Sequence, residues 1–397
     1  MEGIARQLYN QHFTEEKYQH FLDDIAHAYK HRPIFRICES PVFVDHDLKR
    51  KIFRACDEIT EVIMQPNFKE LTASAIAPEY FVPNEGNHNL FLQYDFGICE
   101  LPDGSLAPKL IELQGFPTLY FYQDLVANMY RKHFHIPDNY SHLFGGLDSS
   151  AYIELLRKVI VGDEDPKHVI LLEIEPETQP TQIDYLATSA VLGIKTLCIS
   201  DLKKEGKDLY YLDRHGNKVE VRRIYNRVIF DELVGRKDLK RAFSFTDEIH
   251  AKWVGHPNWF FRVSKSTLPF LKGDYVPKTM VLSDLNSLPD DLENYVLKPL
   301  YSFSGSGVVF NVTQNNLDAI EDKSNYILQE KVKYSPVIES PDGKVKCEVR
   351  MLMLWEENAP RPVLVNNLAR MSKGEMIGVK YNKNKTWVGG SVGFFQK

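Results

Sequence analysis

The residues with the clearest chemical potential lie in segment 295–310, which reads YVLKPLYSFSGSGVVF. An apolar stretch ends in Lys298-Pro299, a short polar loop follows, and a second apolar stretch closes the unit. Small loop residues let backbone N–H groups approach an anion closely, and a lysine at the root of the loop adds a positive charge. We therefore expect a phosphate-binding loop at Ser304, Gly305, Ser306 and Gly307.

Segment 295–310 taken alone is equally typical of a plain hairpin with a solvated lysine. It lacks the GxxxxGK[ST] pattern of a Walker A loop and the GxGxxG pattern of a dinucleotide-binding fold. Its interpretation as a phosphate loop therefore depends on other parts of the chain.

A second group of polar residues lies much earlier, in segment 92–117, which reads LQYDFGICELPDGSLAPKLIELQGFP. Side chains two residues apart on a strand share a face, so Glu112 and Gln114 point the same way, and Asp95 on the partner strand can join them. Oxygen atoms are the ligands that Mg²⁺ prefers. The pattern predicts a Mg²⁺ site at Asp95, Glu112 and Gln114; the alternative is an ordinary amphipathic hairpin with its polar face in water.

Regular elements must position these residues. Helical spacing of apolar residues predicts helices over 15–29, 47–64, 120–133, 149–160 and 181–192. Apolar or alternating stretches predict strands over 89–100, 106–114, 168–174, 195–200, 221–231, 295–299, 307–312, 326–331, 344–355 and 362–371, with a further hairpin at 209–212 and 218–221. The strand–helix–strand order within 168–200 is typical of a parallel α/β unit.

The chain length of 397 residues favours two or three cooperating domains. We expect an N-terminal helical segment with the metal-bearing strands over 1–145, an α/β substrate domain over 146–248, and a lobe with the lysines, lid loop and hinge over 249–397. The fold class is therefore α/β with some α+β character.

The composition limits the functional classes. A formal net charge of −6 argues against a general nucleic-acid binder, which needs clustered lysine and arginine. Five scattered cysteines without a CxxC pair favour free thiols in a reducing compartment. The N-terminus lacks the apolar core of a signal peptide, and no apolar run is long enough to span a membrane. We expect a cytoplasmic protein with no membrane partner; its oligomeric state is not predicted.

The order of these elements resembles the ATP-grasp superfamily. Lys265 precedes a helix, Lys298 ends a strand before a Gly-rich lid, and strand 326–332 (YILQEKV) follows. The resemblance implies that both lysines contact the α- and β-phosphates of ATP and that Arg350 and Arg370 face the γ-phosphate and an acyl phosphate. It also implies a hinge that meets adenine, formed by Gln329, Glu330, Lys331 and Val332.

The metal-bearing strands come first in this chain, whereas the common ATP-grasp order places them last. This order is similar to that of the circularly permuted ATP-grasp proteins, of which glutathionylspermidine synthetase is the best-known type. The likeness covers the chain from about Val42 onward and includes the middle α/β unit. Two positions depart from the family pattern: Gln93 stands where the family has arginine, and Gln114 where it has asparagine.

The resemblance implies an ATP- and Mg²⁺-dependent carboxylate–amine ligase that works through an acyl phosphate. Its substrates would be a small-molecule carboxylate and an amine of the amino-acid, peptide or polyamine type. Two alternatives stay open: an ATP-binding relative without ligase turnover, which Gln93 supports, and a phosphotransferase that stops at phosphorylation. Arg227 either faces the cleft or forms an ion pair with Asp231 or Glu232.

Overall fold

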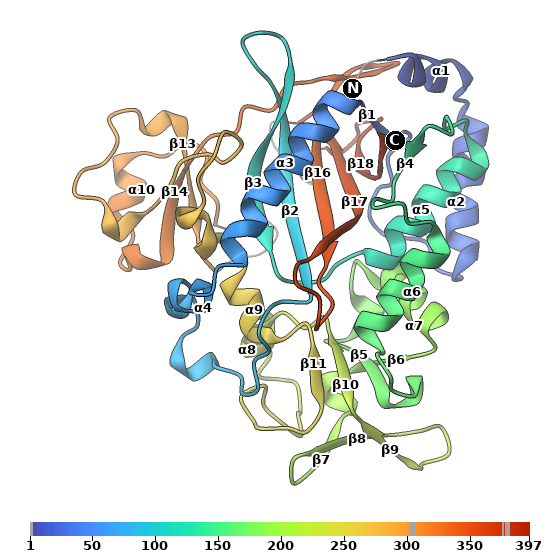
Figure 1. Ribbon diagram of the computed structural model, residues 1–397, viewed down its shortest axis with the longest axis vertical. Coiled ribbons are helices and arrows are strands. Elements are labelled where there is room, and N and C mark those ends of the chain that lie inside the picture. Colours follow the sequence, from blue (N-terminus) through green and yellow to red (C-terminus); the bar gives the residue numbers. More distant parts are fainter. Residues whose placement is uncertain (1–2, 302–306, 375–376, 378–381) are drawn as a thin grey trace.

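The computed structural model describes residues 3–301, 307–374, 377 and 382–397. Its central antiparallel sheet has the strand order β18-β17-β16-β2-β3, with β15 paired to β16 (Figure 1). Strands from distant parts of the chain therefore share one sheet: β2 (Phe91–Glu100), β3 (Leu106–Gln114), β15 (Ile338–Ser340), β16 (Gly343–Leu354), β17 (Val363–Ser372) and β18 (Gly389–Ser391).

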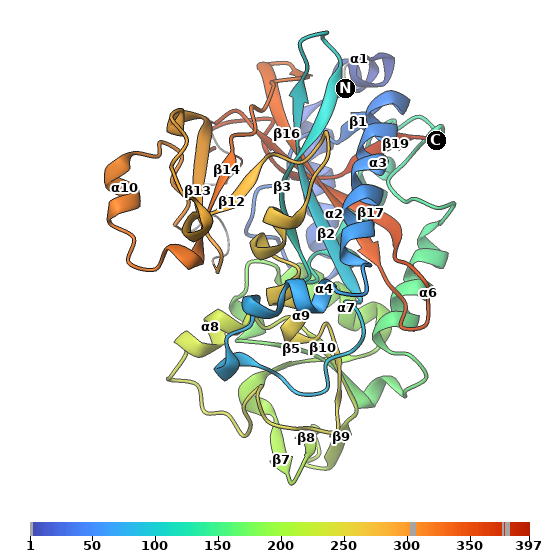
Figure 2. The ribbon, with the colours of Figure 1, turned by 60° about the vertical axis from the view of Figure 1, so that its left-hand side comes forward.

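The two faces of β2 have different roles because its side chains alternate. One face is apolar and belongs to the same core as helix α3 (His46–Ile63), which crosses the sheet in Figures 1 and 2. This face consists of Leu92, Tyr94, Phe96 and Ile98. The Tyr94 hydroxyl lies 3.1 Å from the Thr60 hydroxyl of α3. The opposite face carries Gln93 and Asp95. Helix α3 therefore covers the apolar face of β2, and the polar side chains lie on the face away from α3.

The N-terminal helices lie on the side of the molecule where α5 (Tyr120–His133) contacts β17 (Figure 1). Helix α1 (Ile4–His12) leads to α2 (Glu15–Ala28), which packs against α5. Strand β1 (Val42–Val44) runs parallel to β19 (Gly393–Gln396), and β4 (Tyr140–Ser141) runs antiparallel to β19. The N-terminal segment is thus tied to the C-terminal strands by backbone hydrogen bonds.

A parallel sheet forms the lower part of the molecule in Figure 1, with the strand order β11-β10-β5-β6. Its strands are β5 (Val169–Glu173), β6 (Lys195–Cys198), β10 (Arg223–Asn226) and β11 (Lys252–Val254), and α6 (Ser149–Ile160) and α7 (Gln182–Leu192) pack beside it. Strands β7 (Lys203–Glu205), β8 (Asp208–Leu212) and β9 (Lys218–Val221) form a small antiparallel sheet at the tip. The predicted parallel α/β unit and its hairpin are confirmed.

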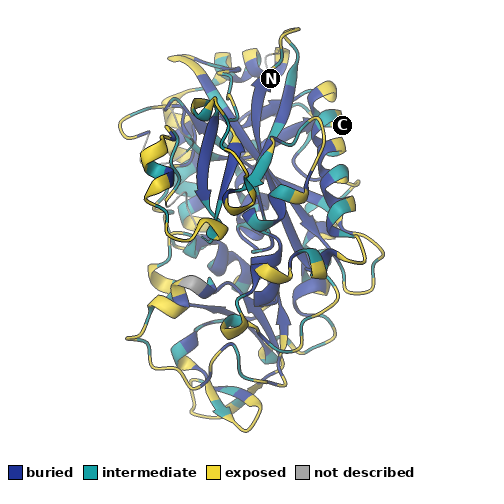
Figure 3. Cartoon of the chain, turned by 90° about the vertical axis from the view of Figure 1, so that its left-hand side faces the viewer, coloured by how far each residue is buried: buried dark blue, intermediate teal, exposed yellow. Residues whose placement is uncertain are grey.

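A small lobe lies to the left in Figure 1 and has its own apolar core. Its antiparallel sheet has the order β12-β14-β13, formed by β12 (Thr279–Val281), β13 (Tyr295–Pro299) and β14 (Tyr326–Glu330), with α10 (Gln314–Asp318) beside it. The short helices α4 (Phe68–Leu71), α8 (Phe230–Gly235) and α9 (Pro257–Arg262) lie between this lobe and the parallel sheet. Figure 3 shows the buried strands and the exposed residues on surrounding loops and helices.

Two predicted strands differ from the structure. Segment 307–312 makes a single bridge, between Val309 and Leu297, in place of a strand. The predicted strand 221–231 ends at Asn226, whose side-chain oxygen accepts a hydrogen bond from the Val228 N–H at 3.1 Å. Such a local side-chain bond competes with the sheet ladder and turns the chain before α8.

Candidate functional site

The polar face of the first hairpin is formed as predicted. In the β2–β3 register Gln93 lies opposite Gln114, and Asp95 lies opposite Glu112. The Gln114 amide nitrogen donates to Gln93 Oε1 at 2.5 Å. The two cross-strand pairs therefore form one continuous polar patch, which confirms the shared face inferred from residue spacing.

Strands β16 and β17 place both predicted arginines on the same patch. Arg350 lies opposite Asp95 and donates to its two carboxylate oxygens from Nε at 2.5 Å and Nη2 at 2.6 Å. Arg370 also donates to Asp95 Oδ2 at 2.6 Å and pairs with Glu348, which accepts a further hydrogen bond from the Tyr334 hydroxyl at 2.8 Å. The result is a network of alternating charges in which Asp95, Glu348 and Arg350 are buried and Arg370 is partly exposed.

The network sets the protonation of its two buried acids in opposite directions. Burial alone would raise the pKa of Asp95, but Arg350 and Arg370 outweigh it and hold that pKa below its ordinary value. Burial raises the pKa of Glu348, against the attraction of Arg370 and with the added repulsion of Asp95. Asp95 is therefore the fixed negative charge of the network.

Lys298 brings the small lobe to this patch. Its ammonium group donates to the Ile111 carbonyl oxygen at 2.9 Å and to Gln329 Oε1 at 2.5 Å. Burial lowers the pKa of Lys298 to about 8, Glu112 opposes this change, and Lys265 adds to it. Lys298 thus contacts Ile111, the residue before Glu112, although β13 and β3 are far apart in the chain.

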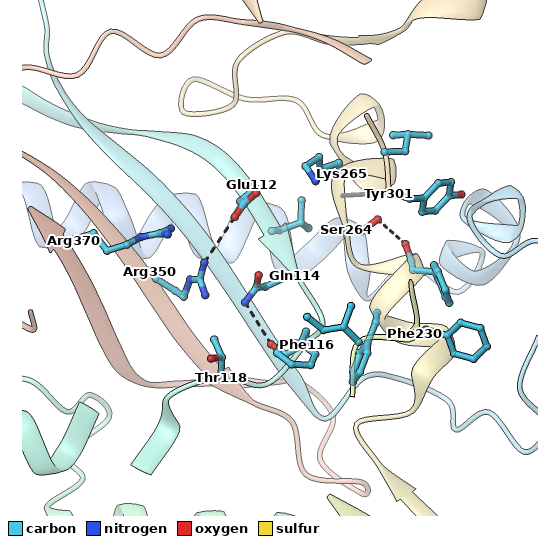
Figure 4. A pocket seen from close by; sticks show the side chains of 15 residues that line it. Glu112, Gln114, Phe116, Thr118, Phe230, Ser264, Lys265, Tyr301, Arg350 and Arg370 are labelled. Carbon is cyan, nitrogen blue, oxygen red and sulfur yellow. Dashed lines mark hydrogen bonds and ion pairs between the residues drawn. The ribbon is translucent and has the colours of Figure 1, made fainter. Parts of the chain in front are cut away.

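A cavity of about 240 Å³ opens between these elements (Figure 4). One side is charged, and Figure 4 shows Glu112, Lys265, Arg350 and Arg370 along it. Lys265 is 7% exposed and is the first residue of a 3₁₀ helix, Lys265–Phe270, so it starts the predicted helix rather than preceding it. Gln114 and Thr118 extend the polar wall, and aromatic side chains close the other side.

The predicted lid is only partly described. Ser304, Gly305 and Ser306 lie outside the described residues. Gly307 has a φ of 71°, a left-handed conformation that favours glycine, and a Cβ there would lie 3.0 Å from Pro299. The lid therefore stays a prediction. Its last residue, Gly307, has a backbone conformation that favours glycine.

The predicted hinge has some of its backbone donors already engaged. The Glu330 N–H donates to the Lys278 carbonyl at 2.9 Å, and the Lys331 N–H donates to the Asn294 carbonyl at 2.8 Å. A contact between this backbone and adenine would therefore not use the N–H groups of Glu330 and Lys331, and the predicted hinge otherwise stays a prediction.

The predicted Mg²⁺ ligands have suitable chemistry but are not arranged as a ready metal site. Among the described residues, no three His, Cys, Asp or Glu side chains converge in a way that could hold a metal ion. Asp95 and Glu348 are turned toward arginines, and Gln114 is an amide. The available donors are oxygen atoms, which suits Mg²⁺. Asp95, Glu112 and Gln114 therefore remain a predicted ligand set that would have to exchange arginine contacts for the ion.

The site also fits a polyanion. Arg370 Nε and Gln329 Nε2 are buried and find no acceptor among the described residues. An unsatisfied buried donor is costly, and a phosphate oxygen would satisfy it. Basic side chains at the site also outnumber its carboxylates: Lys265, Lys298, Arg350 and Arg370 against Asp95, Glu112 and Glu348.

Two features of this neighbourhood were not predicted. Glu348 was not among the predicted site residues, yet it lies two residues before Arg350 on β16, and residues two apart on a strand share a face, so the spacing could have revealed it. Arg227 pairs with Asp184 at 2.9 Å, both fully buried. Among the side chains that the structure describes, its carboxylate partner is therefore Asp184 and not the predicted Glu232; the side chain of Asp231 lies outside the described residues. Asp184 also accepts from the N–H groups of Leu119, Phe121 and Tyr122 at the start of α5. No local spacing signals this long-range pair.

Glu173 ends β5 in a buried position and supplies a test of the middle domain. Its carboxylate accepts from the Tyr185 hydroxyl at 2.7 Å, and burial raises its pKa to about 7. An acid whose pKa is raised in the folded state contributes its full stabilisation at a pH below its pKa in the unfolded state. This contribution is lost as the pH rises through the folded-state pKa, here about 7. The wild type should therefore lose up to about 3 kcal/mol of unfolding free energy between about pH 4.5 and 7. Glu173→Gln, which cannot ionise at this position, should not show this loss.

Urea unfolding across this pH range measures the difference between the variant and the wild type. The exposed Glu177→Gln supplies the control and should leave the pH profile unchanged. Equal profiles for Glu173→Gln and the wild type would contradict a raised Glu173 pKa.

Comparisons with known proteins agree with the fold. The sequence matches no protein-family model, and no curated protein is significantly similar to it. Among solved structures it is similar to the apo form of a glutathione synthetase-like effector, GSS30, from Globodera pallida. The TM-score is 0.59 at 10% sequence identity, and the match covers 100% of this chain and 98% of the other. This likeness shows a shared mixed α/β fold.

Among the described residues, no helix is both long and apolar enough to cross a bilayer.

Proposed function

We propose that this protein is an ATP- and Mg²⁺-dependent ligase that joins a small-molecule carboxylate to an amine, built on a circularly permuted ATP-grasp fold. The observation that carries the proposal is the contact between the Lys298 ammonium group and the Ile111 carbonyl beside Glu112, at 2.9 Å. It brings the predicted phosphate-binding lysine and the predicted metal-binding hairpin to one place. The fold shared with a glutathione synthetase-like protein agrees with a ligase of this kind.

The proposed reaction has two balanced steps. A substrate carboxylate oxygen attacks the γ-phosphorus of ATP, which gives an acyl phosphate and ADP. An amine then attacks the acyl carbon, so that an amide forms while phosphate and a proton leave. The protein mainly positions the reactants and neutralises their charge.

The predicted basic and metal-binding residues each have a role in this proposal. Lys265 and Lys298 would bind the α- and β-phosphates, and Arg350 and Arg370 would hold the transferring phosphoryl group through forked donors. Asp95, Glu112 and Gln114 would hold Mg²⁺, which when bound supplies positive charge to the phosphates. This arrangement needs Asp95 to trade its arginine contacts for the ion, while Arg350 and Arg370 turn to phosphate.

A second candidate is an ATP-binding protein without ligase turnover. Gln93 favours it: this fully buried side chain, where the family has arginine, is hydrogen-bonded to Gln114 and accepts from Arg350 Nη1 at 3.3 Å. It therefore adds no positive charge at the site.

Hydroxylamine separates the two candidates because it intercepts acyl phosphates as hydroxamates, without knowledge of the natural amine. Purified protein is incubated with Mg²⁺, ATP and a broad panel of carboxylic acids. The ligase proposal predicts acid-dependent release of ADP together with hydroxamate. Saturable ATP binding without either product would favour the non-catalytic candidate.

The depressed pKa of Lys298 gives a pH prediction. A lysine with a pKa of about 8 loses its positive charge as pH rises through that value. ATP affinity should therefore fall above about pH 8, by up to about tenfold per pH unit. Calorimetric titration between about pH 7 and pH 9.5 measures this. Lys298→Arg keeps its charge and should flatten the profile; the same fall in that variant would assign it to another group.

A further inference from the structure

The cavity beside the charged patch has a second, apolar side. Figure 4 shows Phe116 and Phe230 at the side away from Arg350 and Arg370. This wall is assembled from the segment after β3, from the start of α8 and from the C-terminal half of α9. It consists of Phe116, Ile229, Phe230, Phe260 and Phe261. We call it the aromatic wall.

The aromatic wall is packed in a defined geometry. Phe116 meets Phe260 edge-on, with ring centroids 5.2 Å apart, and Phe230 meets Phe261 in the same manner at 5.7 Å. Such edge-to-face pairs favour fixed ring positions. Behind Phe116 lies the guanidinium group of Arg227, 5.1 Å from the ring centroid and anchored by the buried Asp184. The unpredicted Arg227–Asp184 pair thus supports one side of the cavity.

The wall does not belong to the expected adenine site. The hinge residues 329–332 are not among the residues that line this cavity. The wall instead faces the arginines that the proposed function assigns to the phosphoryl group, so an acid that reacts there would place the rest of its structure against it.

The chemistry of the wall selects against highly charged substrates. Glu112 is the single acidic side chain among the described lining residues, and it lies on the charged side. A polyamine or a peptide with several charges would bury charged groups against phenylalanine rings without partners, which is costly. An apolar group would gain from burial there.

The size of the cavity points the same way. A volume of about 240 Å³ exceeds the roughly 150 Å³ of a cavity that holds benzene, and it is below the ~300–1,000 Å³ typical of sites for drug-sized ligands. It suits a molecule of single amino-acid size.

We propose that the carboxylate substrate is a small acid with one compact apolar side chain, aromatic or branched aliphatic, which packs on the aromatic wall while its carboxylate faces Arg350 and Arg370. This inference rests on the proposed function and narrows its carboxylate substrate from any small-molecule carboxylate to apolar acids of amino-acid size.

The first experiment measures turnover with the hydroxylamine assay on matched acids. Phenylalanine and leucine represent apolar acids, while aspartate, glutamate and glutathione represent charged ones. The inference predicts hydroxamate formation with the apolar acids and at least about tenfold lower kcat/KM with the charged ones. Preference for a charged acid would overturn the inference and leave the ligase proposal standing.

The second experiment measures binding without turnover, by calorimetric titration of phenylalanine in the presence of a non-hydrolysable ATP analogue. Phe116→Ala should weaken binding about tenfold or more. Phe270→Ala is the matched control, because Phe270 is 40% exposed and does not line the cavity, and it should bind as the wild type does. Phe116→Leu keeps an apolar group if the alanine variant fails to fold, and should favour leucine over phenylalanine.

These two experiments separate the proposals. Phenylalanine binding that depends on Phe116, without hydroxamate from any acid, would support the aromatic wall as an apolar subsite and count against the ligase. Equal binding by the wild type, Phe116→Ala and Phe116→Leu would overturn the inference whatever the turnover.

Discussion

Replacing Arg350 by methionine should lower the free energy of unfolding by about 3–5 kcal/mol. Arg350 holds both oxygens of Asp95, which is 1% exposed and carries the fixed negative charge of the network. Removing the guanidinium group leaves this buried charge with Arg370 alone. Loss of one partner of a buried pair costs more than the pair itself contributes, because the remaining charge is poorly solvated.

Urea unfolding tests this prediction against a matched variant. Arg361→Met removes an arginine whose side chain is 48% exposed and whose carboxylate contacts are 3.4 Å long, so its cost should be below about 1 kcal/mol. The double variant Asp95→Asn/Arg350→Met removes both charges and should recover part of the loss. Similar losses in Arg350→Met and Arg361→Met would contradict the buried network.

The second large effect concerns ATP. Lys298→Met should weaken ATP binding by about tenfold to a hundredfold, because a hydrogen bond to a charged group contributes about 1.5–3 kcal/mol. The fold should tolerate the change, since burial already disfavours the charged lysine and methionine fills a similar volume.

Calorimetric titration with Mg-ATP measures the affinity, and urea unfolding verifies that the variant is folded. Lys323→Met changes an exposed lysine of the same lobe and should bind ATP as the wild type does. Unchanged affinity in Lys298→Met would remove this lysine from the phosphate site.

Local sequence signals predicted the elements that carry the site. Helices α5 and α6 begin and end at the predicted residues, because their apolar spacing has clear limits. The β2–β3 hairpin was also predicted, since alternation and the turn at 102–105 are local features, and alternation placed Asp95, Glu112 and Gln114 on one face. The composition of segment 295–310 indicated Lys298, and the family resemblance supplied Arg350 and Arg370. In the structure both arginines lie on that face and Lys298 contacts the same hairpin.

Features that depend on contacts between distant segments could not be predicted from the sequence. The Asp184–Arg227 pair links α7 to the segment after β10, and its two members carry no mark of their partner. Asp95 forms ion pairs with two arginines because β17, β16 and β2 are neighbours in one sheet. Residue spacing does not predict this strand order. The aromatic wall likewise draws on segments far apart in the chain, so its phenylalanines read as ordinary core residues.

The most direct test of the proposed site is a double-mutant cycle on Mg-ATP affinity with Glu112→Gln and Lys298→Met. If both side chains serve the same nucleotide, each variant should bind Mg-ATP more weakly, and Glu112→Gln should also reduce the gain in ATP affinity that Mg²⁺ produces. Their effects should be coupled, with a double variant that deviates from additivity by more than about 0.5 kcal/mol. Wild-type Mg-ATP affinity in both single variants would contradict a nucleotide site shared by Lys298 and Glu112.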